Sequence, residues 1–170
     1  MCSSDLLVEL LRLRPAFARE LLALVGVSLP RHDALLPDSS AADADGRAPR
    51  HPDAVFLAWR RGRKKPVAAL ACEVQLGIDA DKYVAWPHYV FHAERMFETD
   101  AWLLVLTLDR AVARWARRVR ARKSYQLTPA VVGPDEIPLV ATRRDARRSP
   151  ELAVLSCLDR KSTRLNSSHL

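Results

Sequence analysis

Two polar side chains, Glu73 and Gln75, interrupt the apolar segment 66–76, PVAALACEVQL. Successive side chains of a strand alternate between its two faces, so these two share one face with Ala69 and Ala71. A buried strand that carries a carboxylate and an amide on one face indicates a functional site. The alternative is a strand end that emerges into solvent.

Asp53 supplies a second carboxylate at the start of the strand-like segment 53–60, DAVFLAWR. The basic turn 61–65 joins this segment to segment 66–76, which predicts a β-hairpin. Antiparallel pairing would then bring Asp53 and Glu73 together at one end of the sheet. Two such carboxylates suit Mg²⁺ or Mn²⁺, and a metal held there activates water and stabilises charge on a phosphodiester. The alternative for Asp53 is a turn-capping aspartate.

The remaining elements must position this hairpin. The helical spacing of Leu6, Leu10 and Leu13 predicts a first helix that Ser3 or Ser4 caps and that Pro15 ends or kinks, before a helix resumes over 17–25. The composition of residues 29–52, rich in Pro, Asp and Ala, predicts a long, partly mobile connection. After the hairpin we expect a helix over 83–97 with Pro87 near its first turn or at a kink, a buried strand over 101–108, a basic helix over 110–122, a strand over 126–132, and a last helix capped by Ser149 with Pro150 at its first position. This order predicts an α/β fold with a mixed sheet covered by helices.

Asp53, a hairpin and the strand motif EVQ (73–75) together resemble the PD-(D/E)xK nuclease superfamily, in the variant with Gln in place of the usual Lys. The stretches HPDAVFLAW, PVAALACEVQLGIDADKYVAWPHYV and LLVLTLDRAVARWAR are similar to uncharacterised bacterial proteins allied to the Rpn-type recombination-promoting nuclease and putative transposase group. The similarity extends over nearly the whole chain up to Leu158. It implies a restriction-endonuclease-like mixed β-sheet flanked by helices.

The resemblance also implies a metal site for Mg²⁺ or Mn²⁺. Asp53 and Glu73 would be its ligands, and the carbonyl of Val74 would assist. Glu9, on the first helix, would match the upstream acidic residue that many members carry. The alternative for Glu9 is a solvated helix residue.

Gln75 stands where the family's Lys orients or activates the attacking water. A neutral amide supplies no positive charge and is neither an acid nor a base near neutral pH. Lys82, on the following helix, would compensate for the missing lysine, or would simply pair with Asp79 or Asp81. The function that follows is a divalent-metal-dependent DNA endonuclease; the alternative is a catalytically inactive, nucleic-acid-binding or interaction module with the same fold.

Two further groups of residues bear on partners and metals. The basic groups at 60–65, 114–123 and 143–148 would form a phosphate-contacting surface only if they surround the carboxylates. His88 and His92 have the i, i+4 spacing of a helical zinc site, but no third ligand is evident, which favours helix-surface histidines.

Residues 159–169, DRKSTRLNSSH, resemble, residue for residue, the translation of a ligation adapter used in short-read DNA sequencing. We therefore expect an artificial tail over 159–170 and a single domain over 1–158 whose C-terminal helical region is truncated. The chain has 27 Lys and Arg against 20 Asp and Glu, a formal net charge of +7; without the three basic and one acidic residues of the tail it is +5. This basic balance is compatible with an anionic partner such as DNA.

Length and composition agree with one globular domain, because the chain has 170 residues, 49% hydrophobic and 28% charged. The longest apolar runs are far shorter than the roughly 20 residues that a membrane span needs. We expect no signal peptide, because Asp5 and Glu9 interrupt the only candidate, and the three scattered cysteines, of which Cys72 is expected in the core, do not suit a disulfide framework. We therefore expect a cytoplasmic protein that does not enter a membrane; the oligomeric state stays open.

Overall fold

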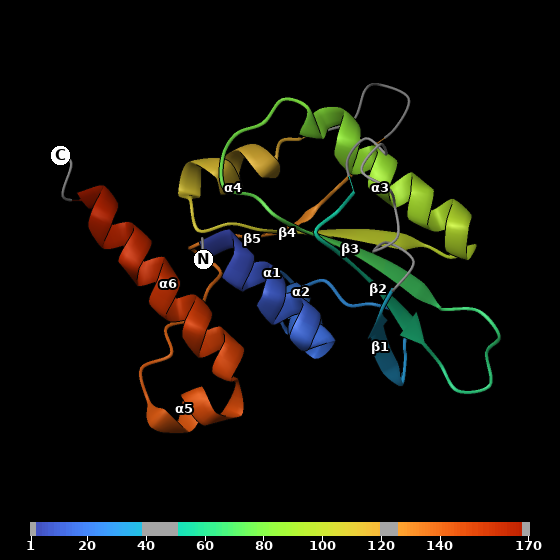
Figure 1. Cartoon of the computed structure of the whole chain (residues 1–170), viewed down its shortest axis with the longest axis horizontal. Coiled ribbons are helices and arrows are strands. Elements are labelled where there is room, and N and C mark those ends of the chain that lie inside the picture. The colour runs from blue at the N-terminus through green and yellow to red at the C-terminus, as the bar shows by residue number, and fades with distance from the viewer. Residues whose placement is uncertain (1–2, 39–50, 120–125, 168–170) are drawn as a thin grey trace.

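The computed structural model describes residues 3–38, 51–119 and 126–167 (Figure 1). In this part of the chain the fold is a mixed sheet of five strands in the spatial order β1-β2-β3-β4-β5. The first three strands pair antiparallel and the last three pair parallel. The strands are β1 (Ala34–Pro37), β2 (Ala54–Trp59), β3 (Ala68–Val74), β4 (Ala101–Leu106) and β5 (Ala130–Val132). The predicted mixed α/β sheet is therefore confirmed.

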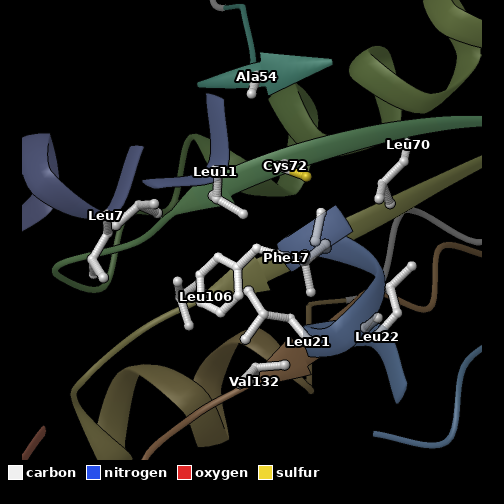
Figure 2. Close-up of a cluster of buried hydrophobic side chains, with 14 of the residues drawn as sticks. Leu7, Leu11, Phe17, Leu21, Leu22, Ala54, Leu70, Cys72, Leu106 and Val132 are labelled. Atoms are coloured by element: carbon white, nitrogen blue, oxygen red, sulfur yellow. The ribbon is translucent and has the colours of Figure 1, made fainter. Parts of the chain in front are cut away.

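Helices cover both faces of the sheet. Residues of α1 (Ser3–Leu13), α2 (Pro15–Leu24) and α6 (Pro150–Ser167) pack into one core with alternate residues of β3 and β4. On the other face, α3 (Lys82–Phe97) and α4 (Arg110–Ala116) form a second core with the intervening strand residues. Figure 2 shows part of the first core, in which the labelled side chains are Leu7, Leu11, Phe17, Leu21, Leu22, Ala54, Leu70, Cys72, Leu106 and Val132.

Strand β3 is the centre of this arrangement, because it pairs antiparallel with β2 and parallel with β4. All of its residues are buried. Cys72 lies in the α1/α2 core and Ala71 in the α3/α4 core, so strand alternation places Glu73 on the α3 side. The prediction that Cys72 is a core residue is confirmed.

Several sequence expectations differ from the structure in detail. Segment 29–52 is not only a connection, because β1 lies within it and pairs with β2; residues 39–50 fall outside the described part of the chain. Helix α4 ends at Ala116 rather than at residue 122, and β5 begins at Ala130 rather than at residue 126. The short helix α5 (Arg143–Arg148) was not expected. The strands β1 and β5 are short and are defined by pairing with their neighbours, whereas α4 and α5 are helices of only seven and six residues.

The helices α3 and α6 each contain a proline that the sequence singles out, and Ser149 precedes α6. Pro87 lies inside α3, and α6 begins at Pro150, as its position after Ser149 predicts. The Ser149 carbonyl accepts from the Ala153 N–H (3.1 Å) at the start of α6, and the Ser149 hydroxyl donates to Glu20 Oε2 (2.7 Å) on α2. Helix α6 continues to Ser167, through most of the segment that resembles an adapter translation. In the described residues no helix combines the length and the apolar character that a membrane crossing requires.

Candidate active site

The candidate site lies at the end of the β2–β3 hairpin. The strand register pairs Ala54 with Cys72, so its continuation by one residue places Asp53 opposite Glu73. Asp53 Oδ2 accepts a hydrogen bond from the backbone N–H of Val74 (2.7 Å). Arg12 of α1 donates to the Asp53 carbonyl oxygen from Nη2 (2.8 Å) and Nε (3.2 Å). The aspartate is thus fixed through both its carboxylate and its backbone.

Glu73 is a buried acid, with only 5% of the residue exposed. Its Oε1 forms an ion pair with Nζ of Lys82, the first residue of α3, whose side chain is 17% exposed. Its Oε2 is buried and has no hydrogen-bond partner among the described residues. The carboxylate therefore has one oxygen neutralised by Lys82 and one oxygen without a hydrogen-bond partner of ordinary geometry.

Trp86 forms the inner wall beside this carboxylate. It lies four residues after Lys82, and residues at this spacing share one face of a helix. Its side chain is fully buried and packs against Trp115, with ring centroids 5.4 Å apart. The indole Nε1 makes no hydrogen bond of ordinary geometry in the described part of the chain, but it acts as a donor toward the Glu73 carboxyl and so helps to lower the pKa of that group.

The electrostatics of the site disfavour a second negative charge. Burial raises the pKa of Glu73, the hydrogen bond and charge of Lys82 lower it, and the charge of Asp53 raises it, with a net increase. Burial and these same two carboxylates also raise the pKa of the Cys72 thiol, which stays neutral. A cation bound to Oε2 of Glu73 would relieve this cost, and the oxygens of Asp53 and Glu73 are of the type that a hard divalent metal prefers.

Gln75 is buried directly after β3, and its main-chain and side-chain N–H groups donate hydrogen bonds to backbone carbonyls. Its backbone N–H donates to the carbonyl of Leu106 (2.9 Å), and its side-chain Nε2 donates to the carbonyl of Gly77 (2.5 Å). The amide nitrogen is therefore committed to the turn that leads into α3. That Gln75 positions water stays a prediction, and it would have to use the amide oxygen.

Glu9 is not placed beside the two carboxylates. It is exposed on α1, 3.9 Å from Arg12, and α1 packs on the sheet face opposite to α3. In the described segments no group of three or more His, Cys, Asp or Glu side chains could hold a metal. The acidic ligands that the structure brings together are thus Asp53 and Glu73.

The basic groups do not form one surface around the carboxylates. The turn 61–65 lies at the opposite end of the hairpin from Asp53 and Glu73, and α5 lies on the far side of the molecule from that turn (Figure 1). On and after α4, Arg110 is paired with Asp135 (2.9 Å) and Arg117 with Glu136 (2.6 Å). A phosphate-contacting surface would have to form from separate patches.

His88 and His92 lie on the exposed side of α3, with ring centroids 6.1 Å apart and ring planes at 23°. The described residues supply no third His, Cys, Asp or Glu ligand for them. Their position agrees with the helix-surface interpretation that the sequence favours.

Sequence reasoning missed two contributors to the site. Trp86 is not among the candidate site residues above, yet its i, i+4 spacing from Lys82 places both side chains on one face of the helix and could have indicated its role. Arg12 carries no such signal, because its contact with the backbone of Asp53 depends on how α1 crosses the sheet.

No protein-family model matches this chain, and neither a curated protein nor a solved structure matches it significantly.

Proposed function

We propose that this protein is a divalent-metal-dependent nuclease that hydrolyses phosphodiester bonds, with DNA as the substrate and the cytoplasm as its compartment. The observation that carries the proposal is the pair of carboxylates on adjacent strands, Asp53 and Glu73, with Glu73 Oε2 buried and unpartnered. The mixed sheet with flanking helices supports it, because it is the architecture that the resemblance to PD-(D/E)xK nucleases implies.

In this proposal Asp53 and Glu73 hold Mg²⁺ or Mn²⁺ with the carbonyl of Val74 as a further oxygen donor. When bound, the metal supplies a water of lowered pKa and positive charge opposite the reacting phosphate. The Val74 N–H fixes the Asp53 carboxylate, which leaves its other oxygen to act as a ligand. Because these donors are held by the hairpin itself, the site is organised before any ligand arrives.

Lys82 and Trp86 shape the other side of the site. Lys82 orients Glu73 through Oε1 and places a positive charge where the neutral Gln75 offers none. The fully buried Trp86 excludes water behind the carboxylate and so strengthens its interaction with a cation.

A second candidate function is a binding module that has kept the fold and lost the chemistry. The observation that favours it is the use of Gln75, whose amide nitrogen is bound to Gly77 rather than directed at a substrate. The ion pair between Lys82 and Glu73 would then be a structural feature of the core.

The test is nicking of supercoiled plasmid by the full chain in Mg²⁺ or Mn²⁺, with EDTA as the blank. We expect metal-dependent nicking that falls at least about 100-fold in Asp53→Asn and in Glu73→Gln, because even residues that only support metal ligands contribute about 10- to 100-fold. Asp79→Asn is the matched control, since Asp79 accepts a hydrogen bond from the Asp81 N–H in the loop before α3.

The control variant should nick like the unaltered chain. Absence of nicking by a folded, metal-treated protein would favour the binding module, whereas nicking that survives in both site variants would place any activity elsewhere.

A further inference from the structure

The charges buried at the site do not balance a divalent cation. When both acids are ionised, Asp53 and Glu73 contribute two negative charges and Lys82 one positive charge, while the guanidinium of Arg12 is offset by Glu9. The site without ligands therefore carries a net charge of about −1, and a divalent ion would change it to about +1. Excess charge in a poorly hydrated site is costly because water screens it weakly.

The excess positive charge of a bound divalent cation would fall mainly on the Glu73 carboxylate. Lys82 already occupies Oε1 of Glu73, and only Oε2 is free, so a cation there shares the carboxylate with an ammonium group. Lys82 is the first residue of α3 and its side chain is mostly buried, which limits its freedom to move away. Two positive groups on one carboxylate repel each other, and each weakens the binding of the other.

A phosphodiester removes the excess, because it brings one negative charge and oxygens that accept from both positive groups. We infer that Lys82 makes the divalent metal and the phosphodiester bind cooperatively: the site binds the metal weakly alone and tightly only together with the substrate phosphate. This inference rests on the proposed function and adds to it the order of events at the site. By thermodynamic linkage, the metal must strengthen phosphodiester binding by the same factor.

The experiment measures Mn²⁺ affinity of the full chain from the electron paramagnetic resonance signal of free Mn²⁺. Two added ligands are compared, a thymidine dinucleotide with its phosphodiester and the same dinucleotide with an uncharged methylphosphonate. For the unaltered chain we expect the phosphodiester to tighten Mn²⁺ binding about 10-fold or more, within the usual range of coupling between sites, and the methylphosphonate to leave it unchanged.

Lys82→Met keeps the length of the side chain and removes its charge. We expect this variant to bind Mn²⁺ alone about 10-fold more tightly than the unaltered chain, with little further gain from the phosphodiester. Lys65→Met is the matched control, because Lys65 pairs with Glu98 on the exposed end of the hairpin. Lys82→Arg keeps the charge and should keep the cooperativity, which guards against an effect of misfolding.

The possible outcomes distinguish this inference from the proposed nuclease function on which it rests. Equal Mn²⁺ affinities for Lys82→Met and the unaltered chain, or equal gains from the phosphodiester, would overturn the inference, even if the chain nicks plasmid in a metal-dependent manner. No Mn²⁺ binding by any variant with either ligand would overturn both the inference and the metal-dependent nuclease.

Discussion

Glu73 combines two properties that a purely structural acid rarely has: it is almost completely buried, and only one of its oxygens has a partner. A buried acceptor without a partner costs about 1–3 kcal/mol, and more if it is charged. The ion pair with Lys82 offsets part of this cost but leaves Oε2 unsatisfied. At the residue scale, the stability of the fold therefore depends on the protonation of this one side chain.

The first prediction concerns pH and Glu73→Gln. The pKa of Glu73 is raised in the folded protein, so the folded state holds its proton at pH values where the unfolded chain has lost it. The native chain must therefore lose stability as pH rises from the ordinary carboxyl pKa through the raised one. Glutamine does not titrate. The unfolding free energy of Glu73→Gln, measured by urea denaturation, should therefore rise relative to that of the unaltered chain as the pH increases from 4 to 8.

Asp53, Lys82 and Cys72 face this carboxyl and are unchanged in the variant, so the pH-dependent difference belongs to Glu73 itself. Glu98→Gln is the control of opposite sign, because Lys65 lowers the pKa of Glu98. A difference between the native chain and Glu73→Gln that stays constant from pH 4 to pH 8 would contradict the raised pKa.

At the element scale, a polar clamp connects the N-terminal helices to α6. Arg14, between α1 and α2, pairs with Glu20 (2.8 Å) and with Glu151 of α6, and Glu20 accepts a hydrogen bond from Ser149. The apolar partner of this clamp is Leu155, which is fully buried in the α1/α2 core. The clamp therefore fixes the position at which α6 begins relative to α2.

The second prediction is that Arg14→Met destabilises the chain more than Arg110→Met. The side chains of Arg14 and Glu151 are 36% and 15% exposed, whereas those of Arg110 and Asp135 are 59% and 63% exposed. Exposed pairs contribute about 0–1 kcal/mol, and removal of one partner from a network also leaves acids unpaired. We expect the free energy of unfolding, obtained from denaturant midpoints, to fall by about 1–2 kcal/mol in Arg14→Met and by under about 0.5 kcal/mol in Arg110→Met. Equal losses in the two variants would mean that the clamp stabilises the fold no more than an exposed ion pair.

The elements also show where sequence reasoning succeeds and fails. The hairpin, α3 and β4 could be predicted because each has a long pattern or a basic turn that marks its limits. Strand β1 could not, since it has four residues and its register comes from β2. The ion pair of Lys82 with Glu73 is not among the alternatives that the sequence offers, which are compensation for the missing lysine or a pair with Asp79 or Asp81, because the sequence does not determine how α3 is rotated on the sheet. The clamp at Arg14 likewise depends on contacts between distant segments.

At the scale of the whole molecule, metal binding and global stability are linked. A ligand that binds only the folded state at 100 times its Kd stabilises it by about 2.7 kcal/mol. The third prediction is that Mn²⁺ together with the phosphodiester dinucleotide raises the Tm of the chain by several degrees, and that neither does so alone. Asp53→Asn should abolish the shift, and an equal shift in that variant, seen by thermal denaturation, would place the metal elsewhere.

The five described strands lie side by side in the same order as they occur along the chain. Each strand thus pairs with its nearest neighbour in sequence, but the parallel pairs β3–β4 and β4–β5 require crossover connections, whose closure costs loop entropy. Asp53, Glu73 and Lys82 all fall within the short stretch of chain that forms β2, β3 and the start of α3. The candidate site is thus contained in one short stretch of the chain, whereas the contacts of α6 with the N-terminal helices join segments from opposite ends of its described part.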